Sequence, residues 1–277
     1  TLGGFGFQVQ QTADADDHWE FQVGSDSTVW SVYRFEYPEE KATPTSILPA
    51  DIAKVSKRPK LAVIIDDFGY SMNETITGFI SLKEAFTAAV IPGRPYSTQV
   101  DERLNNRSIQ TLIHMPMVTV TNSTSEPDYA LSEDLSDGEI VRRLKKARKD
   151  VPRAIGMNNH QGSGGTQSRK VMTGVTGFLA EQKMFFIDSR TIAASVGETV
   201  ARERYVPTNS RDVFLDEVDD QEAIAGELFR LARIAKEQGE AIGIGHCRPN
   251  TLKTLKKYLP ALAEAGFDLV PVSKLAK

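Results

Sequence analysis

The first part of the chain contains short segments in which apolar and polar positions alternate. Segments 5–10, 19–23 and 29–35 follow this two-residue period and are rich in aromatic and β-branched side chains. Such a period is typical of β-strands that bury one face. The stretch 38–59 contains several prolines and indicates a linker. We therefore expect residues 1–59 to form a small β element, a hairpin or meander, followed by that linker.

From residue 60 onward, short apolar runs alternate with amphipathic stretches. The runs are continuous, as in parallel strands that are covered on both faces. Those that we expect to form strands are 61–65, 86–91, 111–115, 154–157, 184–187, 213–215, 241–244 and 269–272. Strands that alternate with helices in this way predict an α/β fold.

Three of the intervening helices have recognisable features. A capping box of the form Ser-x-x-Glu occupies 136–139. Residues 219–238 carry apolar side chains on one face, and Asn250 is expected to cap the last helix. The order of elements over residues 60–277 predicts a single domain, a distorted (β/α) barrel of mostly parallel strands, with the small N-terminal β segment added to it. A doubly wound open sheet is the alternative.

The composition is that of an ordinary globular protein. Of 277 residues, 40% are hydrophobic and 25% are charged, which allows a core of normal size. The formal net charge of −4 argues against a nucleic-acid-binding protein. The basic run 142–146 has helical spacing, and we interpret it as a solvated helix face.

Three further observations limit the possible classes of protein. The longest apolar run is far too short to span a bilayer. Cys247 is the single cysteine, which excludes an intramolecular disulfide and a cysteine-based zinc site. The chain begins with Thr1 and not with methionine, so we expect that an upstream piece has been removed.

Polar residues come directly after five of the apolar runs. They are Asp66 and Asp67, His114, 158–160, 188–190 and His246. Because the carboxyl ends of parallel strands meet at one face of a barrel, we expect these side chains to converge. Each also has a structural interpretation, such as a helix cap, a hydrogen-bonded histidine, a turn or an ion pair. Such separate reasons need not select the same end of five strands, which favours a functional site.

This mixture of residue types suits a catalytic metal. Imidazole nitrogens and one carboxylate make a three-ligand site that leaves a position open for water. A zinc ion lowers the pKa of such a water molecule to about 7. A second carboxylate can act as base, and a separate histidine as acid towards the leaving group. Adjacent aspartates on a strand point to opposite faces, but a turn at the strand end lets one bind metal while the other faces substrate.

The motifs resemble the divergent polysaccharide deacetylase family of bacterial envelope-associated proteins. They are LAVIIDDFGY (61–70), IHMPM (113–117), GMNNHQGS (156–163), FFIDSRT (185–191), RDVFLD (211–216) and IGHCRP (244–249). Together they cover residues 60–275, and residues 1–59 lie outside the resemblance. The family is related to the family 4 carbohydrate esterases, which have a distorted (β/α) barrel. Two motifs of those esterases are absent here, a His-x-x-x-His pair on one segment and an Arg-x-Pro-Tyr motif. The similar-looking 94–96 comes after the second strand and is interpreted as a loop.

The resemblance implies a role for each of five residues. Asp66 would be the catalytic base and His246 the acid. Asp67, His114 and His160 would bind a divalent metal. We expect zinc first, with manganese, cobalt and nickel as alternatives.

Three more residues complete the predicted site. Either Arg190 or Arg211 is expected to orient Asp66 and to lower the pKa of its carboxyl group. Asp188 is expected to favour the protonated form of His246, and it is also the reserve metal ligand.

The resemblance implies a metal-dependent hydrolase of carbohydrate metabolism that removes N- or O-acetyl groups from an envelope polysaccharide or peptidoglycan. Its partner would be a glycan substrate, with no nucleic acid and no membrane span in this chain. Its location would be periplasmic or otherwise extracytoplasmic. Two alternatives stay open: a non-catalytic, envelope-associated carbohydrate-binding module that retains the barrel, and another barrel amidohydrolase. The oligomeric state and the role of residues 1–59 are left open.

Overall fold

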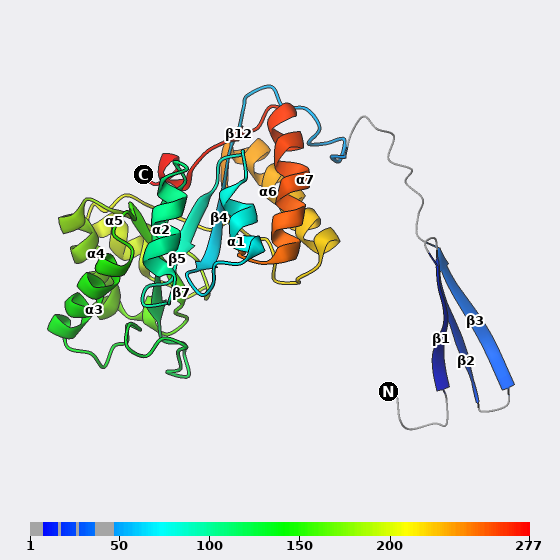
Figure 1. The fold of residues 1–277 in the computed structure, drawn as a ribbon, viewed down its shortest axis with the longest axis horizontal. Coiled ribbons are helices and arrows are strands. Elements are labelled where there is room, and N and C mark those ends of the chain that lie inside the picture. The colour runs from blue at the N-terminus through cyan, green and yellow to red at the C-terminus, as the bar shows by residue number, and fades with distance from the viewer. Residues whose placement is uncertain (1–7, 16–17, 26–27, 37–46) are drawn as a thin grey trace. The chain divides into compact units, whose positions relative to one another are not determined.

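The computed structural model describes residues 8–15, 18–25, 28–36 and 47–277 (Figure 1). The chain divides into two compact units, Thr1–Ser46 and Ile47–Lys277. The predicted division at residue 59 stays a prediction.

The smaller unit contains the small N-terminal β segment predicted from the sequence. Its strands are antiparallel neighbours in the order β1-β2-β3, which makes a meander. Their bounds are β1 Gln8–Ala15, β2 His18–Ser25 and β3 Thr28–Glu36. Residues 5–7 of the first predicted strand and 38–46 of the predicted linker lie outside the described residues.

The larger unit is built on one sheet in which every neighbouring pair of strands is parallel. The strands are β4 Lys60–Phe68, β5 Thr87–Val90, β6 Gln110–Met117, β7 Gly156–Gln161, β8 Phe185–Asp188, β9 Thr208–Ser210, β10 Val213–Phe214, β11 Glu240–His246 and β12 Asp268–Leu269. Their order is β10-β11-β4-β5-β6-β7-β8-β9, with β12 paired to β4.

This strand order is that of a barrel that has not closed. Strands β4 to β9 follow one another in chain order, and β10 and β11 return to the other side of β4. A closed ring would also pair β9 with β10, but these strands are the two free edges of the sheet. The sheet is therefore an open, strongly curled half-barrel. The predicted distorted barrel is confirmed, and the doubly wound alternative is wrong.

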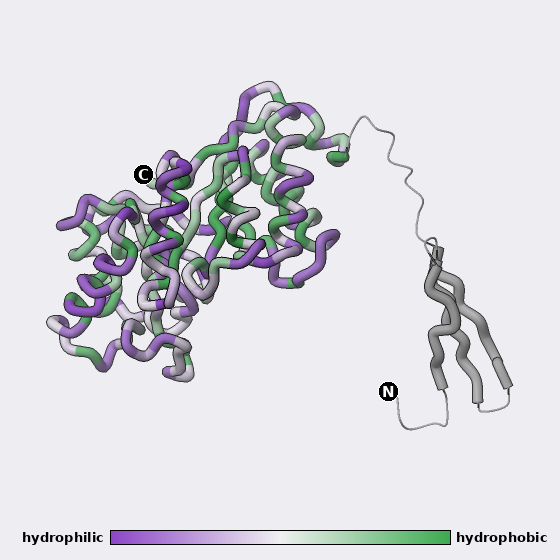
Figure 2. The backbone as a smooth tube through the Cα atoms, in the orientation of Figure 1, coloured by the Kyte–Doolittle hydropathy of each residue, from purple (hydrophilic) through white to green (hydrophobic). Residues whose placement is uncertain are grey.

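Helices cover the outside of the curled sheet (Figure 1). They are α1 Glu74–Ile80, α2 Ser97–Asn105, α3 Asp137–Asp150, α4 Arg169–Gln182, α5 Gly197–Glu203, α6 Gln221–Gln238 and α7 Pro249–Glu264. Their hydrophilic and hydrophobic segments alternate along the chain (Figure 2), as expected for helices with one buried side. No helix among the described residues is both long and apolar enough to cross a membrane.

The predicted helix ends can be compared with the structure at two positions. The Ser136 hydroxyl accepts a hydrogen bond of 3.2 Å from the Glu139 amide, as the capping box predicts. The prediction that Asn250 caps the last helix is wrong, because α7 already begins at Pro249 with Arg248 as its N-cap. Proline suits the first helical position, where its missing N–H costs no hydrogen bond.

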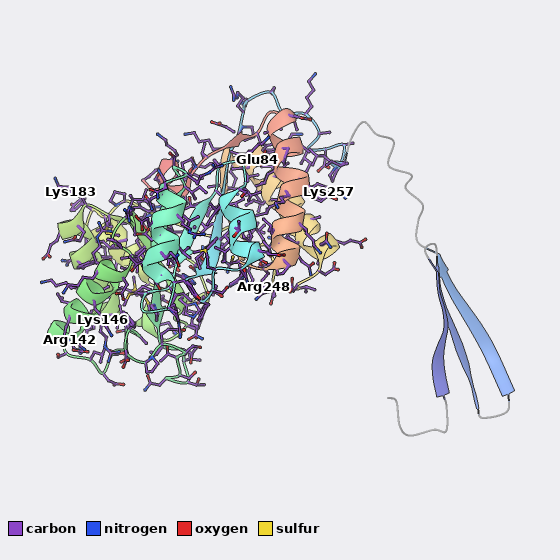
Figure 3. The ribbon with its side chains drawn as sticks, in the orientation of Figure 1. Glu84, Arg142, Lys146, Lys183, Arg248 and Lys257 are labelled. Atoms are coloured by element: carbon purple, nitrogen blue, oxygen red, sulfur yellow. The ribbon has the colours of Figure 1, made fainter. Side chains whose placement is uncertain are left out.

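The basic run 142–146 lies on α3, where Figure 3 labels Arg142 and Lys146. The Arg142 guanidinium is exposed and pairs with Glu139 at 2.6 Å. The Lys146 ammonium lies 3.9 Å from the centre of the Tyr129 ring.

Two buried apolar clusters cover the two faces of the sheet. The larger one packs the sheet against the helices. The smaller one fills the inside of the curl and includes Ala62 and Ile64 of β4, whose neighbours Val63 and Ile65 belong to the outer cluster. The C-terminal residues Val272 and Leu275 also belong to the inner cluster. The inside of the curl is therefore packed, and a site can open only where this packing ends.

Candidate functional site

The polar residues of the site continue the inner row of apolar residues. Ile64, Leu112 and Ile244 belong to the cluster inside the curl. Because side chains alternate between the faces of a strand, the residue two positions later also faces inwards. The inward-facing polar residues in the carboxyl-terminal parts of β4, β6, β7 and β11 are Asp66, His114, Asn158, His160 and His246. Parallel register then makes neighbours of His246 and Asp66, and of His114 and Asn158.

Asp67 would face outwards if β4 continued regularly. The pairing of β4 with β5 shifts between Ile65 and Phe68, and Asp67 has a φ of +67°. Residues other than glycine rarely adopt this left-handed conformation, although aspartate tolerates it better than most. As a result, His114 Nε2 lies 3.5 Å from both Asp66 Oδ2 and Asp67 Oδ1. The bulge turns the carboxylates of two consecutive residues towards one imidazole.

Asp67, His114 and His160 bring three potential ligand atoms together. Asp67 Oδ1 lies 3.5 Å from His114 Nε2 and 3.3 Å from His160 Nδ1. The two imidazole nitrogens are 3.0 Å apart. Zinc bonds of about 2.0 Å at tetrahedral angles separate their ligand atoms by about 3.3 Å. The three spacings fit that geometry.

The state of Asp67 also fits a bound cation. Its Oδ1 is buried and has no hydrogen-bond partner, which is costly for a carboxylate unless a positive charge lies beside it. Burial alone would raise the pKa of Asp67, but the imidazoles of His114 and His160 hold it well below its usual range. Asp67, His114 and His160 could therefore bind a metal ion.

Asn158 orients two members of the site at once. Its Nδ2 donates a hydrogen bond of 2.8 Å to Asp66 Oδ1. Its Oδ1 must then be the acceptor in the 2.9 Å contact with His114 Nδ1. In the neutral tautomer that donates through Nδ1, the lone pair of His114 is on Nε2, the atom next to Asp67 and His160.

Glu126, in the loop between β6 and α3, holds the other side of His160. The Glu126 carboxylate lies 3.3 Å from His160 Nε2, accepts a 2.8 Å hydrogen bond from the Tyr70 hydroxyl and forms an ion pair with Arg94. Burial opposes ionisation, but these partners lower the pKa of Glu126 to about 2. Burial likewise opposes the charged imidazole, but Asp67 and Glu126 raise the pKa of His160 to about 9. Carboxylates of this kind fix the orientation of metal-binding histidines.

Asp66 differs from the expectation in its partner and in its pKa. The hydrogen bond that orients it comes from the Asn158 amide and not from an arginine. The side chain is almost fully buried, and burial raises its pKa, although His114 and His246 favour the charged form. The sequence predicted a lowered pKa. The direction is reversed because burial outweighs the neighbouring positive charges.

His246 is held by a carboxylate that differs from the expected Asp188. Its Nδ1 lies 2.8 Å from Asp216 Oδ1, and its backbone N–H donates to Asp216 Oδ2 at 2.6 Å. The Thr251 hydroxyl donates to the same Oδ2 at 2.6 Å. Burial opposes protonation, but Asp216 and Asp66 raise the pKa of His246. Asp216 follows β10, which pairs with β11, so its carboxylate lies next to His246 and the first turn of α7.

Asp188 instead organises the loop after β8. Its Oδ1 accepts a 2.8 Å hydrogen bond from the Arg190 amide, and its Oδ2 accepts one of 2.6 Å from the Ser195 hydroxyl. Arg211 donates to the carbonyl oxygens of Ser189 and Arg190 at 2.7 Å and 3.0 Å. The catalytic roles predicted for Asp188 and Arg190 stay predictions.

A cavity of about 730 Å³ opens on this face, in the size range of small-molecule sites. Asp66, His114, His160 and His246 line one part of it, and Arg190, Arg211, Phe214 and Arg230 line another. The carboxyl ends of the strands thus meet at one open cavity.

Comparison with known sequences identifies similar proteins over most of the larger unit. The model of the family described as divergent polysaccharide deacetylase matches residues 63–276. The chain is 37% identical over 216 residues to an uncharacterized protein of Haemophilus influenzae, covering 78% of this chain and 76% of that one. It is 32% identical over 216 residues to the uncharacterized protein YibQ of Escherichia coli, covering 78% and 67%.

Solved structures share the fold at lower identity. The structure of an uncharacterized protein from Agrobacterium tumefaciens matches with a TM-score of 0.75 at 19% identity, over 79% of this chain and 90% of that one. A pseudoenzyme of carbohydrate esterase family 4 (CE4) from Bacillus anthracis matches with a TM-score of 0.52 at 13% identity, over 79% and 66%. These similarities extend to the fold alone.

Proposed function

Because this chain belongs to the divergent polysaccharide deacetylase family, we propose that it is a metal-dependent hydrolase that removes acetyl groups from a glycan of the bacterial envelope. In this proposal the substrate is an acetylated polysaccharide or peptidoglycan, and the reaction takes place in the periplasm or elsewhere outside the cytoplasm. The observation that carries the proposal is the convergence of Asp67, His114 and His160 beside a buried carboxylate, Asp66, and a carboxylate-bound imidazole, His246.

In this proposal, Asp67, His114 and His160 hold a zinc ion. One oxygen and two imidazole nitrogens are a ligand set that zinc accepts, and their spacing fits tetrahedral bonds. The ion would supply Lewis-acid chemistry, which polarises the acetyl carbonyl group and activates water. His114 is prepared for this role by Asn158, and His160 by Glu126.

Asp66 is the base that takes a proton from the attacking water. Its raised pKa makes it a better proton acceptor than an ordinary aspartate, since a base works best when its pKa approaches the working pH. The Asn158 amide occupies Oδ1. Oδ2 is therefore the oxygen that faces the reacting groups, 3.5 Å from His114 Nε2.

His246 is the acid that protonates the leaving nitrogen or oxygen of the sugar. Its Nδ1 is engaged by Asp216, so Nε2 is the atom that donates the proton. Asp216 also favours the imidazolium form that this role requires. His246 and Asp66 are register partners on adjacent strands, which places acid and base on the same side of the cavity.

The test is acetate release from acetylated chito-oligosaccharides and peptidoglycan fragments, with zinc supplied. We expect Asp66→Asn and His246→Ala each to lower turnover by about 10²–10⁴-fold, the usual contribution of a general base or acid, while zinc content is retained. Small amides included in the same panel separate a glycan deacetylase from another barrel amidohydrolase.

Full activity in both variants contradicts the assigned roles. If none of the glycans releases acetate although the protein binds zinc, the proposed deacetylase activity is contradicted and the carbohydrate-binding module is supported. The non-catalytic carbohydrate-binding module remains the alternative because a CE4 pseudoenzyme has a similar fold.

A further inference from the structure

The cavity wall beside the metal ligands contains guanidinium groups without acidic partners. Arg190 and Arg211 line the same cavity as Asp66 and His246. Within residues 47–277, neither arginine forms an ion pair with a carboxylate, whereas the neighbouring Arg230 pairs with Glu227 at 2.5 Å. These two arginines thus line a space that a substrate must enter.

Arg211 is fixed by the backbone. Its Nε and Nη2 donate to the carbonyl oxygens of Ser189 and Arg190, and its guanidinium lies 5.1 Å from the centre of the Phe214 ring. Those carbonyls and the ring hold the group in place without neutralising it. Its Nη1 takes part in neither of these hydrogen bonds.

Arg190 is presented to the cavity by a loop in an unfavourable conformation. Arg190 has a φ of +48°, which a long side chain without local hydrogen-bonding capacity rarely adopts. The Asp188 carboxylate, the Ser195 hydroxyl and Arg211 hold this loop. Strain of this kind persists only where the surroundings impose it, and it is concentrated at functional sites.

The charges in this wall repel one another. Burial lowers the pKa of Arg211, and the positive charges of Arg190 and Arg230 lower it further, while Asp66 acts in the opposite direction. Apart from Asp66 and the paired Glu227, the wall contains one carboxylate, Glu217, which is exposed and makes no ion pair within the described larger unit. A gathering of guanidiniums at a cavity is complementary to carboxylate or phosphate oxygens, which arginine binds in a bidentate manner.

From these observations we infer that Arg190 and Arg211 form a subsite for an anionic group, and that the substrate is an acetylated glycan carrying a carboxylate or phosphate close to the acetyl group. This inference rests on the proposed function, because it places the anion on the molecule that Asp66 and His246 act upon. Asp188 and Ser195 are positioning residues for Arg190.

The same arginines also have a second interpretation, in which they act through Asp66. The two roles differ in kinetics. A subsite residue changes KM for the anionic substrate and leaves the neutral substrate unaffected. A residue that tunes Asp66 changes kcat and its pH dependence for both substrates.

The experiment compares three acetylated substrates: a neutral chito-oligosaccharide, a peptidoglycan fragment that carries the muramic carboxylate, and a phosphorylated N-acetylglucosamine oligomer. We expect a KM about tenfold lower for at least one of the two anionic substrates, in line with one charge-assisted contact. The lower KM of the two identifies the anion as carboxylate or phosphate. Arg190→Gln should abolish the preference, because it should raise KM for the anionic substrate by about tenfold more than KM for the neutral one. Arg211→Gln should act in the same direction.

Arg142→Gln is the matched control, because it removes an exposed arginine of α3 outside the cavity (Figure 3). Equal KM values for neutral and anionic substrates in the unchanged protein overturn the inference. An equal loss of kcat on all substrates in Arg190→Gln also overturns it.

Failure of the proposed function is recognisable separately. If no substrate releases acetate, calorimetric binding of the same three glycans to the zinc-loaded protein decides the matter. A preference for an anionic glycan that Arg190→Gln removes supports the subsite, and equal binding of neutral and anionic glycans refutes it.

Discussion

Glu126 connects segments that are distant in sequence to His160 of the candidate metal site. Its carboxylate contacts Tyr70 after β4, Arg94 after β5 and His160 on β7. Tyr70 is partly exposed, but the Glu126 carboxylate itself is buried. The His160 ring therefore has a fixed orientation before any metal is bound, which lowers the cost of binding.

We predict that Glu126→Gln weakens zinc binding by about 10–100-fold, the usual effect of removing the partner of a metal-binding histidine. The neutral amide no longer compensates the positive charges of His160 and Arg94. Competition with a chelator of known affinity measures the change. Glu133→Gln is the control, because it alters an exposed carboxylate of the same loop. Unchanged zinc affinity in a folded Glu126→Gln protein would show that the ion pair has no role in orienting His160.

Asp216 gives a prediction for pH dependence. An acid must be protonated, so the activity of His246 is lost as the pH rises through its pKa. Burial lowers that pKa and Asp216 raises it, with a net upward shift. Asp216→Asn should therefore move the alkaline limb of the kcat profile to lower pH. Thr251→Val disturbs the same buried network but keeps the Asp216 carboxylate. The alkaline limb of the kcat profile should therefore stay at the same pH in this variant. An unmoved limb in Asp216→Asn would refute the assignment of His246 as the acid.

At the scale of single residues, the sequence reveals the polar side chains that stand at the ends of apolar strands. Asp67, His114 and His160 are recognisable for that reason, and the structure brings them together. Glu126 lies in a polar loop with no periodic pattern, so no signal distinguishes it. Asp216 comes after an apolar run as well, but its pairing with His246 depends on the register between β10 and β11, which a single sequence does not contain.

At the scale of elements, close packing between strands depends on Gly156. A Cβ atom at this position would lie 2.6 Å from the Phe185 ring, so the absence of a side chain lets the Phe185 ring of β8 pack against β7. β7 carries Asn158 and His160, and β6 carries His114. The distance between these two strands therefore sets the spacing of the two imidazole rings.

We predict that Gly156→Ala lowers the free energy of unfolding by about 1–3 kcal/mol, as expected for overpacking in a core. Gly138→Ala is the control, since nothing lies within 4 Å of its added Cβ. Alanine is also the better helix former there, so the free energy should stay equal or rise by about 0.5–1 kcal/mol. Urea unfolding of both variants in the same metal state measures the difference. Equal stability of the two would show that the Phe185 contact relaxes at no cost.

Most of the strand predictions succeed where the side chains are apolar and stop short where they are polar. The prediction 269–272 is wrong after Leu269, because β12 ends there and a 3-10 helix begins at Val272. The run 61–65 predicts most of β4, but the strand continues through Asp66 and Asp67 to Phe68. The predicted 154–157 likewise covers only the start of β7, because its remaining residues are the polar residues of the site. The edge strand β9, Thr208–Ser210, has no apolar pattern and is missed.

At the scale of the whole molecule, one end of the half-barrel is closed and the other is open. The C-terminal segment covers the closed end, where the Val272 amide donates to Thr87 at the start of β5 and Lys277 and Thr208 exchange backbone hydrogen bonds. The open end carries the site. Strand and helix alternation predicts a distorted barrel but not the position of its opening, which lies between the short edge strands β9 and β10.

We predict that deacetylation requires a metal ion held by Asp67, His114 and His160. The most direct measurement is acetate release from an acetylated glycan while metal-free protein is titrated with zinc. Activity should rise with added zinc and level off at about one ion per chain, as one three-ligand site requires. Asp67→Asn should show no such rise. Activity that is independent of zinc, or the same titration curve in Asp67→Asn, would show that deacetylation does not require a metal ion at this site.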